Sequence, residues 1–143
     1  MNVTIRRVDN TDPAVQLALR DMDRECLPLD YPANTSEGVW WVAWKKDVPI
    51  AYASIKQAYK LPDTVYYSRA GVLPAYRGKG LQKKMLRVLL KYAKAEGWKW
   101  VISDTSKDNV ASSNSLITCG FRLYRPITPW SFDSALYWRK ELV

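Results

Sequence analysis

The sequence contains no histidine, the side chain that most often serves enzymes as a base at neutral pH. This absence excludes Ser-His-Asp and Cys-His nucleophilic schemes and removes the commonest zinc ligand. Acid–base chemistry in this chain must therefore use carboxylates, tyrosine, cysteine, serine or ordered water. We expect no metal site.

Cysteine and long apolar runs are also scarce. Cys26 and Cys119 stand alone, without the spacing of a metal site or a disulfide framework. The longest apolar run, residues 39–44, is far shorter than a membrane span. Polar and basic residues interrupt the start of the chain, so we expect no signal peptide. These features favour a cytoplasmic protein without membrane association.

What is present fits one soluble domain over residues 1–143, since hydrophobic residues make up 48% of the chain and charged residues 25%. The net charge is +8, with a pI near 9.5. Such a balance attracts polyanions, either nucleic acid or a phosphate-rich cofactor. It is equally consistent with a solvated basic face.

Hydrophobic periodicity predicts alternating strands and helices. Val3 to Val8 alternates like a strand, and Asp12-Pro13 is typical of a helix start. The predicted order is β-α-β-β-β-α-β-α-β-β, a mixed α/β domain. The predicted ranges are 3–8, 13–26, 39–45, 48–59, 64–73, 80–96, 98–103, 109–118, 121–124 and 135–142.

The helix over 80–96 has the clearest pattern. Its apolar stripe includes Leu81, Met85 and Leu89, and Gly97 follows it as a C-terminal glycine would. Its opposite side is basic. We expect this basic side to face water, with attraction of nucleic acid or a coenzyme phosphate as the alternative. The basic residues are Lys84, Arg87, Lys91 and Lys94.

The loop before this helix predicts a pyrophosphate site. A helix N-terminus presents unpaired N–H groups and favours anions. Gly78 and Gly80 let the backbone approach a phosphate, and Arg77 and Lys79 add positive charge. The spacing is neither that of a P-loop nor G-x-G-x-x-G. A tight strand-to-helix turn without a ligand is the alternative.

Two segments resemble the GNAT superfamily of N-acetyltransferases. Residues 73–81, with Arg77 and Gly80, are similar to its coenzyme A signature, although Gln82 stands where a small residue is usual. Residues 108–112, followed by 118–121, are similar to its N-x-x-[AS] helix and the Gly-Phe strand start after it. The resemblance implies a GNAT-like mixed, mostly antiparallel central sheet with helices on both faces.

The resemblance also implies acetyl-CoA as co-substrate and transfer of its acetyl group to a primary amine by direct attack in a ternary complex. Gly71 falls where the family strand bulges, and backbone N–H groups near Val72 would polarise the thioester carbonyl. The implied coenzyme-binding residues are Val72, Leu73, Arg77, Gly78, Lys79, Gly80, Leu81, Gln82, Asn109 and Ser112.

The catalytic acid and base are less determined. Leu116 occupies a position where family members often carry a tyrosine acid, so Tyr124, Ser115 or Cys119 is left to replace it. Tyr124 has the longest reach, but an aromatic packed in the core is the alternative.

Asp104 is the leading base, because it is expected to end a buried strand beside the acyl group. A carboxylate that caps the following turn is the alternative. Asp30 and Glu37 lie in the expected acceptor loop, and Trp130 lies in a loop that is a candidate for lining the acceptor site.

Two other functions stay open. The departures at Leu116 and Gln82 are compatible with a catalytically inactive coenzyme-binding module on the same scaffold. The charge is compatible with a basic nucleic-acid or protein-interaction domain, although no recognised nucleic-acid motif is present. The sequence does not fix the acceptor, which ranges from small amines to protein amines. Edge pairing of the final strands would permit a homodimer.

Overall fold

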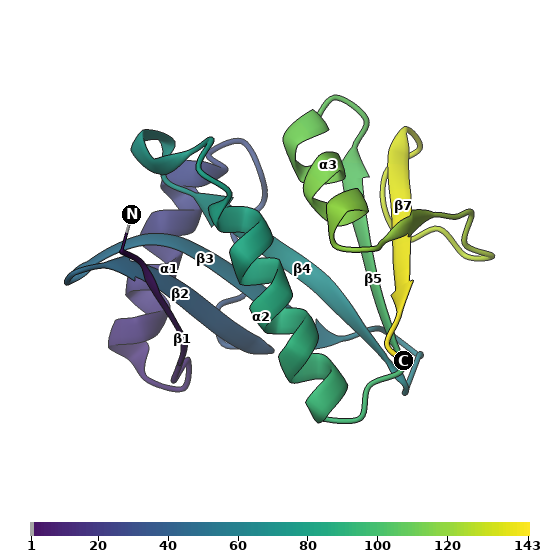
Figure 1. The fold of residues 1–143 in the computed structure, drawn as a ribbon, viewed down its shortest axis with the longest axis horizontal. Coiled ribbons are helices and arrows are strands. Elements are labelled where there is room, and N and C mark those ends of the chain that lie inside the picture. Colours follow the sequence, from purple (N-terminus) through teal and green to yellow (C-terminus); the bar gives the residue numbers. More distant parts are fainter. Residues whose placement is uncertain (1) are drawn as a thin grey trace.

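One seven-stranded sheet, with helices on both faces, organises residues 2–143, which the computed structural model describes (Figure 1). The elements are β1 (Thr4–Val8), α1 (Pro13–Cys26), β2 (Val39–Lys45), β3 (Val48–Gln57), β4 (Thr64–Val72), the short 3-10 helix η1 (Pro74–Tyr76), α2 (Leu81–Ala95), β5 (Trp100–Ser106), α3 (Val110–Thr118), β6 (Arg122–Leu123) and β7 (Ala135–Glu141).

The strand order is β1-β2-β3-β4-β5-β7-β6, and every neighbouring pair is antiparallel except β4 and β5. The parallel pairing is short, running only from Thr64↔Trp100 to Tyr66↔Ile102. Beyond it the two strands diverge, as Figure 1 shows. The predicted fold class, a mixed and mostly antiparallel sheet covered on both faces, is confirmed.

Two apolar layers hold the helices to the sheet. On one face, α2 and α3 bury Met85, Leu89 and Leu116 against the strands. On the other face, α1 buries Leu19 and Met22. Figure 1 shows α2 and α3 in front of the sheet and α1 behind it. The helical spacing of these residues in the sequence explains both faces.

Strand β5 is longer than the sequence pattern indicates. It continues to Ser106, so Asp104 lies within the strand, opposite Tyr137, rather than at its end. Pairing with β7 over its whole length supports this extension, and Trp138 Nε1 donates a hydrogen bond to Thr105 Oγ1 at 2.9 Å. The expected last strands differ too, since β6 has only two residues.

The bulge in β4 lies at Ser68 and not at Gly71. Ser54 pairs with Arg69 and Ile55 with Tyr67, which leaves Ser68 as the extra residue. Gly71 has a different reason to be glycine: a Cβ there would lie 2.6 Å from the ring of Tyr52. The close approach at this glycine is made by the Tyr52 side chain of β3.

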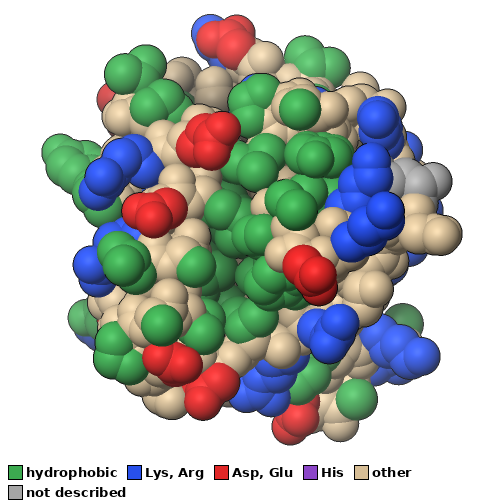
Figure 2. All heavy atoms as spheres, turned by 90° about the vertical axis from the view of Figure 1, so that its left-hand side faces the viewer, with side chains coloured by type: hydrophobic (Ala, Val, Ile, Leu, Met, Phe, Trp, Pro, Cys, Tyr) green, Lys and Arg blue, Asp and Glu red, His purple; other side chains and the backbone are tan. Residues whose placement is uncertain are grey.

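Figure 2 shows the face at the left of Figure 1, where apolar side chains gather in the middle and Lys and Arg side chains along one side. On α2, the predicted basic side is exposed at Lys84, Arg87, Lys91 and Lys94, and no salt bridge in residues 2–143 involves them. Within the same residues, no helix is long and apolar enough to cross a membrane.

Candidate active site

The loop between η1 and α2 presents backbone N–H groups in a geometry suited to an anion. Gly78 and Gly80 both have φ of +77°, and Gly80 is the N-cap of α2. The first N–H bonded back to this cap is that of Lys84, which donates to Gly80 O at 3.1 Å. The N–H groups before it therefore point out of the helix. A Cβ at Gly78 or Gly80 would meet no atom within 4 Å.

Arg77 turns back toward β4. Its Nε donates to Val72 O at 2.9 Å, so the side chain ties the loop to the end of the strand. The guanidinium also lies near Cys26, where burial raises the pKa of the thiol and the charge of Arg77 opposes that rise. The sequence predicted Arg77 beside a phosphate, and the structure adds this positioning contact.

Leu73, a predicted coenzyme contact, has both backbone groups engaged. Its N–H donates to Ile50 O, and its carbonyl accepts from Tyr76 N, each at 2.9 Å. Because residues alternate in an antiparallel pair, Val72 and Ala70 direct their backbone groups to the opposite side. That side is where β5 has diverged, so Val72 N–H and the groups of Ala70 face the gap.

Asn109 and Ser112 come from the start of α3, across the gap from β4. Asn109 Oδ1 caps α3 by accepting from Ser112 N at 3.1 Å. Gln82 Nε2 donates to Ser112 Oγ at 3.1 Å, which links the first turns of α2 and α3. The amide of Gln82 is thus directed to α3.

Asp104 lies just beyond the last β4–β5 pair, where the two strands part. Its Oδ1 accepts hydrogen bonds from the hydroxyl of Tyr66 on β4 and, at 3.0 Å, from Trp130 Nε1. Burial and the charge of Asp104 raise the pKa of Tyr66, which therefore keeps its proton and acts as a donor. Within residues 2–143, Oδ2 accepts no hydrogen bond.

Trp130 connects Asp104 with an aromatic cluster. Its ring lies 4.6 Å from that of Tyr137, 6.1 Å from Tyr66 and 6.4 Å from Tyr124. Arg139 covers Tyr124 at 4.7 Å, and burial raises the pKa of Tyr124. Tyr124 therefore packs beside Trp130, the hydrogen-bond donor of Asp104, and its raised pKa keeps its hydroxyl protonated.

The other acid candidates lie in or after α3. Ser115 donates its hydroxyl to Ala111 O at 3.0 Å, so its proton is engaged within the helix. Leu116 is 2% exposed in the core, which leaves no polar group at the position where the family often has tyrosine. Burial raises the pKa of Cys119, which keeps this thiol protonated.

A buried ion pair that the sequence analysis missed joins α1 to β4. Asp23, 2% exposed, accepts from Arg69 Nε at 2.9 Å and Nη2 at 3.1 Å, and from Tyr52 Oη at 2.6 Å. Burial raises the pKa of Asp23, but the hydrogen bonds of Arg69 and Tyr52 outweigh it and leave the pKa below its usual value. The signal was an aspartate inside the apolar stripe of α1, between Met22 and Cys26.

The same pair holds the expected acceptor loop. Asp23 Oδ2 accepts from Ala33 N at 3.2 Å, and Arg69 Nη2 donates to Tyr31 O at 2.5 Å. Asp30 adds a carboxylate 3.9 Å from Arg69. Glu37, the other acidic candidate of this loop, pairs with Lys56 at 3.3 Å.

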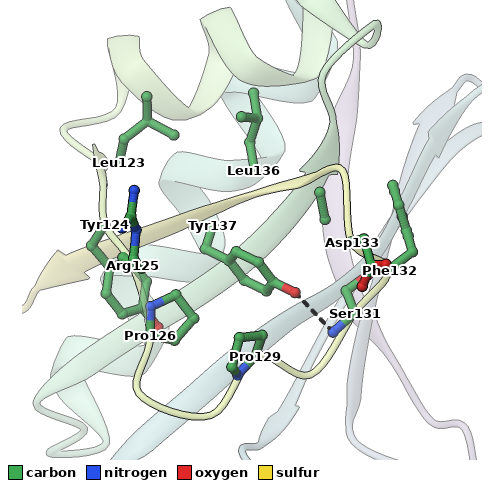
Figure 3. Close-up of a pocket in the computed structure, with 11 residues that line it drawn as sticks. Leu123, Tyr124, Arg125, Pro126, Pro129, Ser131, Phe132, Asp133, Leu136 and Tyr137 are labelled. Carbon is green, nitrogen blue, oxygen red and sulfur yellow. Dashed lines mark hydrogen bonds between the residues drawn. The ribbon is translucent and has the colours of Figure 1, made fainter.

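A cavity of about 430 Å³ lies in the segment between β6 and β7 (Figure 3). Tyr137 Oη accepts a hydrogen bond from Ser131 N at 3.1 Å and so holds the segment to β7. This segment also carries Trp130. The cavity is lined by aromatic, proline and charged residues, among them Tyr124, Arg125, Pro126, Phe132, Asp133 and Tyr137.

The fold is that of an acyltransferase, and the glycine loop at the start of α2 is its candidate coenzyme site. The sequence matches the model of the acetyltransferase (GNAT) family over residues 6–121, so the chain belongs to this family. No curated protein sequence matches it significantly.

Solved structures share the fold at low identity. The ribosomal-protein-S18-alanine N-acetyltransferase of Escherichia coli is 16% identical, with a TM-score of 0.75, over 99% of this chain and 94% of that chain. The yncA protein of Salmonella typhimurium, solved with acetyl-CoA, is 21% identical, with a TM-score of 0.74, over 99% of this chain and 94% of that chain. A Bacillus subtilis acetyltransferase in complex with CoA is 15% identical, with a TM-score of 0.77, over 99% of this chain and 100% of that chain.

Replacing Gly80 with alanine is expected to weaken acetyl-CoA binding at least tenfold, because a β-carbon would stand where the phosphate must approach. Calorimetric titration measures this change. Gly97→Ala is a matched control, since Gly97 also has positive φ (+89°) and free space around a Cβ, but lies at the other end of α2. Equal affinities of the two variants would show that the glycine loop does not bind the phosphate.

Proposed function

We propose that this protein is an N-acetyltransferase that moves an acetyl group from acetyl-CoA to a primary amine by direct attack in a ternary complex. The position of Asp104 supports this most strongly: a carboxylate with one free oxygen lies where β4 and β5 part. We place the reaction in the cytoplasm, a location that two buried free cysteines support.

The residues around the gap fit acetyl-CoA. The glycine loop has space for a phosphate at Gly78 and Gly80, and Lys79 adds positive charge. Val72 N–H and the backbone groups of Ala70 suit the amides of a pantetheine arm. Asn109, Ser112 and Gln82 form the opposite wall. When bound, acetyl-CoA supplies an acetyl group activated as a thioester.

Asp104 is the proposed base. Only a neutral amine is nucleophilic, so a proton must leave the acceptor. Oδ2 of Asp104 binds the incoming ammonium and takes this proton directly or through one water molecule. Tyr66 and Trp130 hold Oδ1 and keep the carboxylate oriented. Backbone N–H groups of β4 that face the gap polarise the carbonyl under attack.

The leaving group needs little assistance. A thiol pKa of about 8.5 makes the thiolate a good leaving group, which takes a proton from water after it departs. We therefore assign no obligatory proton donor. Tyr124 and Ser115, the acids proposed from the sequence, have other contacts: Tyr124 with Trp130 and Arg139, and Ser115 with its own helix.

We propose that the acceptor binds between the loop after α1 and the segment between β6 and β7. Both carry highly exposed apolar side chains, Leu29 at 98% and Tyr31 at 93% on one, and Ile127 on the other. The cavity of this segment suits the part of the acceptor beyond its amine. The E. coli neighbour acts on an alanine of a ribosomal protein, which favours including peptides among the acceptors tested.

Amine-dependent release of free CoA tests the proposal. Acetyl-CoA is incubated with the protein and a panel of polyamines, aminoglycosides, amino acids and peptides with free N-termini. We expect thiol release with at least one class and acetylated amine by mass spectrometry. Release that does not depend on any amine would contradict the proposal.

A coenzyme-binding module without catalysis is the second candidate, favoured by the buried leucine at position 116. It predicts acetyl-CoA binding that requires the glycine loop and no thiol release with any amine. The two candidates therefore agree on Gly80→Ala and differ in the amine panel.

A further inference from the structure

The net positive charge of the protein lies on one segment. Residues 64–95 contain eight Lys and Arg residues and no Asp or Glu, so they account for the whole net charge of +8. Five of these cations are on α2, and neither α2 nor α3 contains an acidic residue. On the other face of the sheet, α1 carries Asp21, Asp23 and Glu25 beside its two arginines. The face covered by α2 and α3 is therefore the strongly basic one.

Four of the cations form a straight stripe along the exposed side of α2. They are Lys84, Arg87, Lys91 and Lys94. At 3.6 residues per turn and 1.5 Å per residue, they fall within an arc of about 80° and extend over about 15 Å. Like charges three and four residues apart repel one another. In the part of the chain that the structure describes, no salt bridge offsets this repulsion.

Two cations from other elements widen the stripe. The guanidinium of Arg7 on β1 covers the ring of Tyr92 at 5.4 Å, and its Nη1 donates to Tyr92 Oη at 3.3 Å. Lys140 of β7 lies at the end of α3, where a Cβ on Gly120 would be 2.6 Å from its Nζ. Strands β1 and β7 lie on either side of α2 (Figure 1). We call this set the basic face: Arg7, Lys84, Arg87, Lys91, Lys94 and Lys140.

Most of the basic face lies too far from the glycine loop to serve the coenzyme. Lys84 is one turn after the N-cap Gly80, so it is close enough to contribute to a phosphate site there. Lys91 and Lys94 are about 16 and 21 Å further along the axis of α2 than Gly80. The stripe therefore continues well beyond the candidate coenzyme site.

We propose that the basic face binds the phosphate backbone of a nucleic-acid duplex. Each strand of a duplex carries one phosphate per 3.4 Å of its axis, a continuous line of charge that suits a straight stripe of cations. Contacts confined to phosphates read no sequence, so this binding is independent of sequence. It goes beyond acetyl transfer and does not depend on that proposed function.

The surroundings of the stripe favour a duplex over other polyanions. Residues 81–95 expose no large apolar side chain, whereas a helix that binds a membrane inserts such side chains into the lipid interface. The aromatic residue of α2, Tyr92, is half-buried and covered by Arg7. It therefore offers no free ring on which a base of a single strand could stack.

Binding at several salt concentrations tests the proposal. Fluorescence anisotropy measures binding of the full chain to short labelled duplexes of DNA and of RNA, with CoA in excess to occupy the glycine loop. We expect the logarithm of the affinity to fall linearly with the logarithm of NaCl concentration between about 50 and 200 mM. The expected slope is about −5, since each of about six phosphate contacts contributes about −0.9. The duplex bound more tightly identifies the kind of nucleic acid.

Two double variants locate the binding. Arg87→Gln with Lys91→Gln should weaken binding of both duplexes at least about tenfold at 50 mM NaCl and make the slope less steep by about two. The same variant should melt no lower than wild type, because repulsion along α2 is relieved. Arg20→Gln with Arg24→Gln is the matched control. It removes the same charge at the same spacing from exposed positions of α1 and should change the affinity less than about twofold.

Several results would overturn the inference. Equal losses in the two double variants would show a general effect of net charge, and displacement of the duplex by CoA would place it at the glycine loop. Equal affinity for polyglutamate or for phosphatidylserine vesicles would assign the face to another anion. Absence of binding to either duplex, or a lower melting temperature of Arg87→Gln with Lys91→Gln, would also contradict it. Failure of the amine panel would overturn the proposed function and leave this inference standing.

Discussion

Asp104→Asn is expected to lower kcat/KM for the amine by about 10²- to 10⁴-fold, the usual contribution of a positioned base. Asparagine keeps the size of the side chain and still accepts hydrogen bonds from Tyr66 and Trp130 through its oxygen. It cannot take a proton from the acceptor. Initial rates of thiol release at saturating acetyl-CoA measure the effect.

The affinity for acetyl-CoA should not change in this variant, because the proposed role of Asp104 is to contact the amine and not the coenzyme. Asp108→Asn is the matched control, since Asp108 is exposed in the turn just after β5 and is expected to keep full activity. An Asp104→Asn variant with wild-type rates would remove Asp104 from the mechanism. Proton transfer to water would then have to replace it.

Arg69→Met is expected to destabilise the protein by about 3–5 kcal/mol, the usual cost of leaving one member of a buried ion pair alone. Asp23 and Arg69 side chains are only 3% and 19% exposed, so water cannot replace the lost guanidinium at Asp23. Urea unfolding at neutral pH measures the loss. Arg24→Met removes an exposed arginine of α1 and should cost little.

Loss of Arg69 should also loosen the acceptor loop, since Arg69 holds the Tyr31 carbonyl. Hydrogen exchange at the backbone of residues 27–36 is expected to accelerate more than exchange in β2. A destabilisation of Arg69→Met no greater than that of Arg24→Met would show that the pair contributes nothing to the fold.

The ion pair predicts a pH dependence of stability. The folded pKa of Asp23 lies below its unfolded value of about 3.9. Its contribution is therefore complete above that unfolded value and disappears as the pH falls through the lower folded value. Acid unfolding of the wild type should be steeper below about pH 4 than that of Asp23→Asn. Parallel curves for the two proteins would contradict this assignment.

Much of the fold was readable from periodic patterns. The apolar stripe of α2 and the alternation of β1 identify their elements, and the glycine loop before α2 was predicted by its residues alone. The bulge at Ser68 was not, because register depends on which residues of β3 and β4 meet. The length of β5 was underestimated for the same reason, since β7, distant in sequence, supports residues 104–106 by pairing.

The site was readable only in part. Asp104 was identified as a carboxylate next to the gap, but its donors Tyr66 and Trp130 come from segments 38 and 26 residues away in sequence. The Asp23–Arg69 pair spans 46 residues and shows only as an unexpected charge in an apolar stripe. Contacts of this kind depend on topology and leave little local signal.

Direct transfer from acetyl-CoA to an amine is tested most directly by initial rates with both substrates varied, alongside the intact mass of the protein. We expect intersecting lines and no added acetyl group on the protein after incubation with acetyl-CoA alone. Parallel lines, together with a protein carrying one acetyl group, would show a covalent intermediate. That result would contradict attack by the amine in a ternary complex.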